Sequence, residues 1–235
     1  VVVTQSFKQN LISRGISEEK IDVITNGFDE ELYRPMPKNK SLIQQYQLQD
    51  KFVVTYIGAH GISHALDKIV LTAEKLKEQK DIQFVFVGEG AEKEKIKAMA
   101  AARNLQNILF IDGQPKEKMP DYYNISDVSL VTLKNIPLFK AFIPSKIFEI
   151  MGCGIPIIAS LDGETADILK KSQAAVIVPP EDAEAMKDAI IKLKENHELR
   201  NTMSKNGPAY VKKYYSRTML AERYMEIIKK TISKG

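Results

Sequence analysis

The sequence predicts an α/β protein built on a doubly wound parallel sheet, with a helical carboxyl-terminal segment. Two observations lead to this fold class. Short runs rich in β-branched and aromatic residues alternate with amphipathic stretches that have helical spacing. The short runs are apolar at nearly every position, which is typical of strands that a parallel sheet buries on both faces. We therefore expect helices on both sides of the sheet.

The predicted elements follow one another in a regular order. Six runs predict strands, namely residues 51–58, 82–88, 107–113, 127–133, 155–160 and 174–180. Helical spacing predicts helices at about 66–76, 91–103, 116–125, from 145 onward, and 164–171. Because ligands of such sheets bind beyond the carboxyl ends of the strands, we expect the binding residues in the loops that follow these runs.

The two flanks of the chain differ from this pattern. Residues 1–37 predict a helix at about 5–14, a short strand at 21–25 and a turn-rich linker outside the core. We assign 38–215 to the sheet domain, which includes two helices after residue 181, and 216–235 to a last helix. The opening residues "VVVTQSF" are unlike a natural start, so we expect a fragment of a longer polypeptide.

Composition narrows the class of protein. The chain has 235 residues, is 44% apolar and 27% charged, and carries a net charge of +4. This mild excess fits an anionic small ligand or a membrane surface better than a nucleic acid, which would require a concentrated basic stripe. The single cysteine, Cys153, excludes an internal disulfide and is expected to be an inert core residue. No apolar run approaches the about 18 residues of a membrane span, and no signal peptide is visible, so we expect a cytoplasmic protein.

The strongest candidate site lies in the stretch "IPSKIFEIMGCG". Pro144 and Ser145 predict a helix start, where free backbone amides and the helix dipole favour an anion, and Lys146 adds a positive charge. Glu149 shares a face with Ser145 about 6 Å further along the axis, where it could accept hydrogen bonds from ribose hydroxyls. Gly152, on the same face, would allow close approach of a ligand. The alternative is a solvent-facing Glu149 and a simple helix cap.

A second candidate is the glycine-containing loop after the first strand of the sheet, "GAHGISHALDK". Gly61 would allow a phosphate to approach the backbone, and His60 and His64 could donate hydrogen bonds to it. The alternative is a glycine-rich turn with surface histidines. The loop lacks the Gly-Lys-Ser/Thr ending of a Walker motif, and "GEGAEK" at 88–93 is only a weak dinucleotide signature. The histidine and cysteine spacing supports no metal site.

These motifs together resemble a known family. The stretches "KIDVITNGFDEELYRP", "VVTYIGAHGISHALDKIV", "FVFVGEGAEKEKI" and "PLFKAFIPSKIFEIMGCGIPIIAS" occur in the order found in the carboxyl-terminal, donor-binding domain of GT-B fold glycosyltransferases. The chain is most similar to the retaining family 4, in the bacterial branch that builds surface polysaccharides. The Pro-Ser-Lys…Glu block is the most specific part of the resemblance, and it favours the ligand-binding interpretation of Glu149.

The resemblance implies a nucleotide-sugar donor, with UDP favoured over GDP, and neither a metal nor another cofactor. Glu149 would bind the ribose, Ser145 and Lys146 would face the phosphates, Gly61 would lie under the diphosphate, and the backbone near Asp112 would border the base. The full set of predicted donor contacts is Pro144, Ser145, Lys146, Glu149, His60, Gly61, Gly88, Glu89 and Asp112.

Two departures from the family pattern affect catalysis. The first carboxylate of the usual glutamate pair falls at Ala141, and the usual arginine and lysine near the diphosphate fall at Ala59 and His64. The available substitutes are Lys140, Lys146 and His64, which we predict to stabilise negative charge on the departing diphosphate. The implied reaction transfers a sugar with retention of anomeric configuration.

The resemblance also implies partners. The acceptor would be a glycan or a lipid-linked glycan, and the acceptor site would lie in an amino-terminal domain of which residues 1–37 are the tail. The last helix would cross back to that domain, and its basic residues could touch anionic lipid at the inner membrane face or simply be solvated. Two alternatives stay open: a GT-B epimerase or hydrolase of nucleotide sugars, and a non-catalytic nucleotide-binding module.

Overall fold

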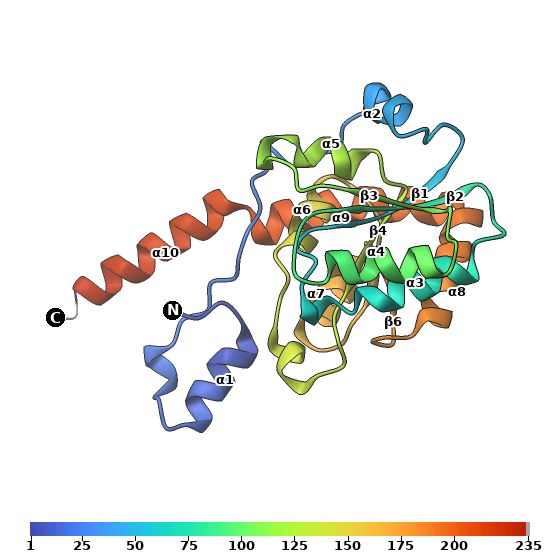
Figure 1. The fold of residues 1–235 in the computed structure, drawn as a ribbon. Coiled ribbons are helices and arrows are strands. Elements are labelled where there is room, and N and C mark those ends of the chain that lie inside the picture. The colour runs from blue at the N-terminus through green and yellow to red at the C-terminus, as the bar shows by residue number, and fades with distance from the viewer. Residues whose placement is uncertain (234–235) are drawn as a thin grey trace.

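A computed structural model describes residues 1–233 of the chain. Six parallel strands form one sheet in the order β3-β2-β1-β4-β5-β6. Figure 1 shows this sheet with the helices around it. The strands are β1 (Phe52–Ile57), β2 (Ile82–Val87), β3 (Ile108–Ile111), β4 (Val128–Thr132), β5 (Ile157–Ser160) and β6 (Ala175–Val178). All six predicted strands are confirmed, and so is the doubly wound α/β fold.

Helices cover both faces of this sheet. All residues of β1 and of β4 are buried, as expected for central strands between two helical layers. One apolar core lies under α3 (Leu66–Lys75), α4 (Lys93–Ala102) and α8 (Ala183–Glu195). The other lies under α5 (Met119–Asn124), α6 (Lys146–Gly152), α7 (Glu164–Ser172) and α9 (His197–Tyr215).

The strand order places a switch point between β1 and β4. From β1 the chain builds outward through β2 and β3, and from β4 it builds outward in the other direction through β5 and β6. The connections that leave β1 and β4 therefore diverge and open a crevice at the carboxyl edge of the sheet, where open α/β sheets bind ligands. The loop at 58–65 and the segment at 133–145 flank this crevice.

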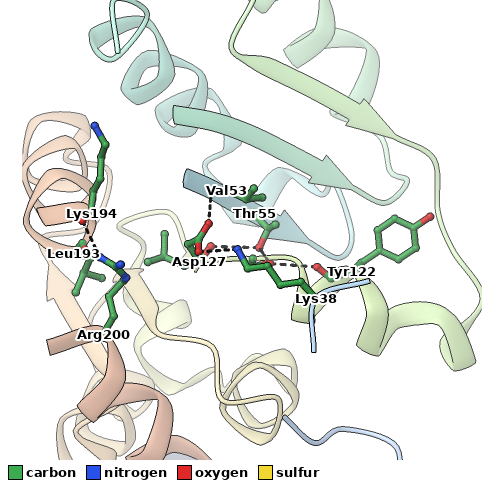
Figure 2. A network of polar contacts seen from close by, with 10 residues as sticks. Lys38, Val53, Thr55, Tyr122, Asp127, Leu193, Lys194 and Arg200 are labelled. Atoms are coloured by element: carbon green, nitrogen blue, oxygen red, sulfur yellow. Dashed lines mark hydrogen bonds and ion pairs between the residues drawn. The ribbon is translucent and has the colours of Figure 1, made fainter. Parts of the chain in front are cut away.

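A polar network fixes the opposite, amino-terminal edge of the sheet (Figure 2). Asp127 accepts hydrogen bonds from the backbone amide of Val53, at 2.7 Å, and from the ammonium of Lys38, at 2.7 Å. Next to it, the hydroxyls of Thr55 and Ser126 are 2.9 Å apart. These contacts align β1 with β4 and hold the incoming chain at Lys38, so this network is structural and lies away from the crevice.

The segment before the sheet is better packed than a linker. The helix expected near its start is present as α1 (Gln5–Ser13), but the expected strand at 21–25 is reduced to a single bridge between Val2 and Val23. The prediction that residues 26–37 lie outside the core is wrong for Phe28 and Tyr33, which are 3% and 2% exposed in the main core. A short helix that we did not predict, α2 (Lys40–Gln45), is capped by Asn39.

One carboxylate attaches α1 to the sheet domain. Glu164, the first residue of α7, accepts hydrogen bonds from the backbone amides of Gln5 and Ser6 at 2.8 and 2.9 Å, and from the Ser6 hydroxyl at 2.8 Å. These amides lie in the first turn of α1, where helix amides lack an intrahelical partner and favour negative charge. Glu164 therefore caps a helix that lies more than 150 residues away in sequence.

Replacing Glu164 with alanine is expected to free α1 from the domain. Loss of these charge-assisted hydrogen bonds should speed hydrogen exchange in α1 by about tenfold, while the sheet keeps its protection. Exchange measured by mass spectrometry on peptides from residues 1–20 tests this. Asp167→Ala, one turn further along α7 and paired with Lys170 at 3.6 Å, is the matched control. Equal protection of α1 in both variants would contradict the capping role.

The carboxyl-terminal residues after β6 form three helices, as expected: α8, α9 and α10 (Arg217–Ile232). In Figure 1 α10 projects away from the sheet on the side where α1 and the N terminus lie. Several large apolar side chains on α10 are exposed, including Tyr224, Met225 and Ile232. Among the helices of residues 1–233, none is long and apolar enough to cross a membrane.

Candidate functional site

Lys146 joins α6 to the end of β1 at the switch point. Its ammonium donates a hydrogen bond to the carbonyl of Ile57, at 3.2 Å, and lies 4.0 Å from the centre of the Tyr56 ring. Burial lowers the pKa of Lys146 to about 7, and the opposing attraction of Glu149 is too small to restore it. The lysine is therefore a half-buried cation whose charge an anionic ligand would stabilise.

Two glycines allow the loops after β1 and β2 to pack against each other. Gly58 has φ +134° and lies so close to Lys146 that a Cβ there would be 3.1 Å from the ammonium. Gly88 has φ +145°, and a Cβ there would collide with the carbonyl oxygen of Gly58. Gly88, which we predicted as a donor contact, thus has a structural role that accounts for its identity without a ligand.

Gly61 differs from these two glycines because the fold does not require it. Its φ of −97° is open to any residue, and the nearest atom to an added Cβ would be Cδ2 of His64, at 3.5 Å. It lies in the loop after β1, beside the crevice. Neither conformation nor packing explains this glycine, so its role as a ligand contact stays a prediction.

The structure contradicts the predicted role of His60. Its side chain is completely buried, with ring centres 5.8 Å from Tyr56 and 6.0 Å from Phe86. Neither ring nitrogen has a hydrogen-bond partner among residues 1–233, and burial lowers the pKa of His60 to about 4. The neutral imidazole is therefore part of an aromatic cluster and cannot reach a ligand in the crevice.

His64 lies in the loop after β1, beside the switch point. Its backbone carbonyl accepts a hydrogen bond from Thr132, the last residue of β4, so the loop after β1 is tied to the strand across the switch point. Burial and the nearby charge of Lys146 lower the pKa of His64 to about 4. The imidazole is neutral near pH 7 and could act there only as a hydrogen-bond partner, leaving Lys146 as the cation on this side.

Glu149 lies one turn into α6 and does not point into bulk solvent. Its side chain is half-buried, and Oε2 accepts a hydrogen bond from the hydroxyl of Tyr123, at 3.2 Å. Burial raises the pKa of Glu149, whereas Tyr123, Tyr33 and the charges of Arg217 and Lys116 lower it. A partly buried carboxylate with donors on its inner side is well suited to accept further hydrogen bonds from a bound molecule.

Other details of this helix start differ from the prediction. Pro144 is buried, and Ser145 is exposed and makes no side-chain capping bond within the described part of the chain, so its hydroxyl is free for other use. The expectation that Gly152 admits a ligand is wrong, because a Cβ there would lie 2.8 Å from the ring of Phe28. Gly152 is needed for that packing.

Glu89 and Asp112, both predicted donor contacts, are joined by a lysine that we did not predict. The buried ammonium of Lys93 donates to Glu89 at 2.7 Å and to Asp112 at 2.6 Å, and Glu89 also accepts the amide of Gly113 at 2.9 Å. These residues connect the loops after β2 and β3. The pairing lowers the pKa of both carboxyls, so they remain charged and hold the two loops together.

Lys140, the remaining catalytic candidate, lies at a different part of the carboxyl edge of the sheet, near the loop after β5. Its ammonium pairs with Asp162, at 3.0 Å, on the loop after β5. Lys140 and Ala141 line a cavity of about 680 Å³ together with Glu164. The structure thus brings Gly58, His64 and Lys146 together at the switch point but gives Lys140 another partner.

Sequence reasoning missed Tyr33, Tyr56, Tyr123 and Lys93. Only Lys93 had a visible signal, since it lies four residues after Glu89 on a predicted helix. Cys153 is buried as predicted, and burial raises its pKa to about 12. Within the part of the chain that the structure describes, no three His, Cys, Asp or Glu side chains gather into a metal-binding group.

The parallel sheet, with its crevice at the carboxyl ends of β1 and β4, is that of a Rossmann-like α/β domain, a fold that binds nucleotides at this position. The chain belongs to the group 1 glycosyltransferases, because the family model "Glycosyl transferases group 1" matches residues 38–210.

Individual relatives agree with this family. The chain is 26% identical over 196 residues to an alpha-D-kanosaminyltransferase of Streptomyces kanamyceticus, covering 81% of this chain and 50% of that protein. It is 26% identical over 190 residues to the putative colanic acid biosynthesis glycosyl transferase WcaI of Escherichia coli. This match covers 78% of this chain and 46% of that protein. The chain spans about half the length of the curated relatives it matches.

Solved structures show the same fold. Anabaena Alr3699/HepE, in complex with UDP and glucose, superposes with a TM-score of 0.85 at 19% identity, covering 97% of this chain and 62% of that one. Sucrose-phosphate synthase from Thermosynechococcus elongatus superposes with a TM-score of 0.83 at 21% identity. The superposition covers 100% of this chain and 59% of that one. The predicted GT-B domain fold is confirmed.

Proposed function

We propose that this chain is the donor-binding half of a retaining, metal-independent glycosyltransferase of family 4, with a UDP-sugar as donor. The observation that supports this most is the arrangement at the switch point. Gly61 lies in the loop after β1 with no conformational or packing need for a glycine, Lys146 supplies a cation, and Glu149 supplies a carboxylate one turn further along α6. This order matches the order of diphosphate and ribose in a nucleotide.

In the proposed complex the diphosphate lies between Gly61 and Lys146, with the Ser145 hydroxyl beside it, and the ribose hydroxyls donate to Glu149. The base lies near the backbone of Asp112. A UDP donor is supported by the fold shared with Anabaena HepE, whose structures contain UDP and UDP-glucose.

In the proposed transfer the bond between the anomeric carbon and the diphosphate oxygen breaks, and its electron pair goes to the diphosphate. The acceptor's hydroxyl oxygen forms the new bond to the anomeric carbon, and its proton goes to the departing diphosphate. Lys146 stabilises that charge because its ammonium is fixed in place before the reaction and partly shielded from water. His64, as a neutral imidazole, can donate one hydrogen bond. Lys140 joins them only if the bound sugar-diphosphate draws it away from Asp162.

The acceptor is proposed to be a glycan or a lipid-linked glycan. Support comes from relatives whose names include a colanic acid biosynthesis transferase and an alpha-galactosylglucosyldiacylglycerol synthase. We place the reaction in the cytoplasm, with the basic helix α10 available for contact with the inner membrane face. The acceptor site lies in the part of the relatives' length that this chain does not span.

The nucleotide site is tested by titrating UDP, GDP and ADP into the wild-type chain and Gly61→Ala. We expect UDP to bind most tightly. The added methyl group should weaken the affinity for UDP by about tenfold or more, because it blocks the position of the diphosphate. The melting temperature should stay within a few degrees, because residue 61 has allowed dihedrals and space for a Cβ. If no diphosphate binds, or if Gly61→Ala keeps full affinity, the proposed site is wrong.

The purified 235-residue chain is expected to bind UDP without efficient sugar transfer, because an acceptor site is missing. Turnover can be followed as release of UDP from UDP-sugars in the presence of glycan acceptors. Robust transfer by this chain alone would show that the acceptor site lies within it.

A further inference from the structure

Two buried tyrosines surround the inner side of the Glu149 carboxylate. Tyr33 and Tyr123 are 2% and 1% exposed, and their rings meet edge to face with centres 6.1 Å apart. The Tyr123 hydroxyl donates to Oε2 of Glu149 at 3.2 Å, and burial together with the nearby Glu149 carboxylate raises the pKa of Tyr33. One tyrosine comes from the segment before β1 and the other from α5, so two separate elements converge on Glu149.

The two tyrosines satisfy only part of the hydrogen-bonding capacity of the Glu149 carboxylate. A half-buried carboxylate needs hydrogen-bond donors, and each of its oxygens can accept about two. The tyrosines can occupy two of these acceptor positions, which leaves acceptor positions of the carboxylate for a bound ligand. Burial raises the pKa of both tyrosines, so their hydroxyls stay protonated and remain donors.

We infer that Tyr33 and Tyr123 are positioning residues that hold the Glu149 carboxylate in the orientation that accepts the ribose hydroxyls of the donor nucleotide. This inference rests on the proposed function. Held from two sides, the carboxylate keeps one rotamer, and a bound ribose meets acceptors that are already oriented.

Tyr33 lies outside the family match at 38–210, in the segment that the sequence predicts to be a linker, and it is buried there. The neighbouring Phe28 and Gly152 pack together and fix the path of this segment against α6. The segment before the sheet therefore contributes to ribose binding through Tyr33, although no part of it lies in the crevice loops.

The test compares UDP with 2′-deoxy-UDP in the 235-residue chain. Tyr33→Phe and Tyr123→Phe remove only a hydroxyl and keep the packed rings. Tyr122→Phe is the matched control, because this neighbouring tyrosine is also buried but its hydroxyl interacts with Tyr46. We expect each test variant to reduce the affinity for UDP by about fivefold to tenfold and the affinity for 2′-deoxy-UDP by less. The preference for ribose over deoxyribose should therefore become smaller. The control should match the wild type for both ligands.

A second comparison uses Glu149→Gln. If the tyrosines act through the carboxylate, Tyr123→Phe should cause little further loss of UDP affinity in a Glu149→Gln background. Equal weakening of both nucleotides by the tyrosine variants would indicate a general structural role and overturn the inference, as would unchanged affinity for both.

The outcomes also separate this inference from the proposed function. UDP binding that depends on Glu149 but not on either tyrosine hydroxyl overturns the positioning role alone. A wild-type chain that does not bind UDP, or binds UDP and 2′-deoxy-UDP equally, overturns the ribose site and the positioning role together.

Discussion

Replacing Lys146 with methionine is expected to weaken UDP binding by about thirtyfold, because a charge-assisted hydrogen bond to the diphosphate contributes about 2 kcal/mol. Methionine has a similar length and retains the contact with the Tyr56 ring. The free energy of unfolding should not decrease, because burial of the ammonium is itself unfavourable, as the lowered pKa of Lys146 indicates. Calorimetric titration together with thermal unfolding separates the two effects.

The same lysine should make UDP binding depend on pH. The pKa of Lys146 is about 7 in the free protein, and a bound diphosphate would raise it, so binding requires proton uptake above pH 7. UDP affinity should therefore fall as the pH rises from about 7 to 9, by at most tenfold per pH unit. The terminal phosphate, with a pKa of about 6, is fully charged over this range and cannot be the cause.

Two variants complete this test. Lys146→Met should abolish the decline above pH 7, whereas Lys97→Met, which removes a partly exposed lysine paired with Glu94, should leave both affinity and pH dependence unchanged. A wild-type affinity that is constant between pH 7 and 9 would contradict the assignment of Lys146 to the diphosphate.

Gly88→Ala is expected to unfold the chain or to reduce its free energy of unfolding by about 3 kcal/mol or more. Alanine is strained at φ +145°, and its Cβ would collide with a rigid backbone carbonyl, that of Gly58, between two central strands. Urea denaturation followed by circular dichroism measures the loss. Gly61→Ala is the control in the neighbouring loop, and a similar stability of the two variants would show that the contact between the loops is not tight.

Most of the fold could be predicted from the sequence because the signals are local and repeated. Runs such as "KFVVTYIG" and "IQFVFVG" are short, β-branched and bounded by glycine, and each is followed by a helical period. Stretches without periodicity were predicted less well. The helix α2 has six residues, too few to show a period, and the strand expected at 21–25 depends on pairing that the local sequence does not encode.

The site could be predicted only in part, because the direction of a side chain depends on tertiary packing. His60 and Gly61 are neighbours in one loop, yet the imidazole is buried against Phe86 while the glycine is partly exposed. Gly152 and Tyr33 were assigned to a ligand face and to a linker, and instead pack in the core around Phe28. The block from Pro144 to Glu149 was found because helix geometry places its charges one turn apart whatever surrounds them.

The most direct test of the proposed site is a crystal structure of the 235-residue chain with UDP bound. We expect the diphosphate between the Gly61 backbone and the Lys146 ammonium, and the ribose hydroxyls within about 3 Å of the Glu149 carboxylate, which keeps its contact with Tyr123. UDP bound away from the carboxyl ends of β1 and β4, or a ribose that does not contact Glu149, would contradict the proposal.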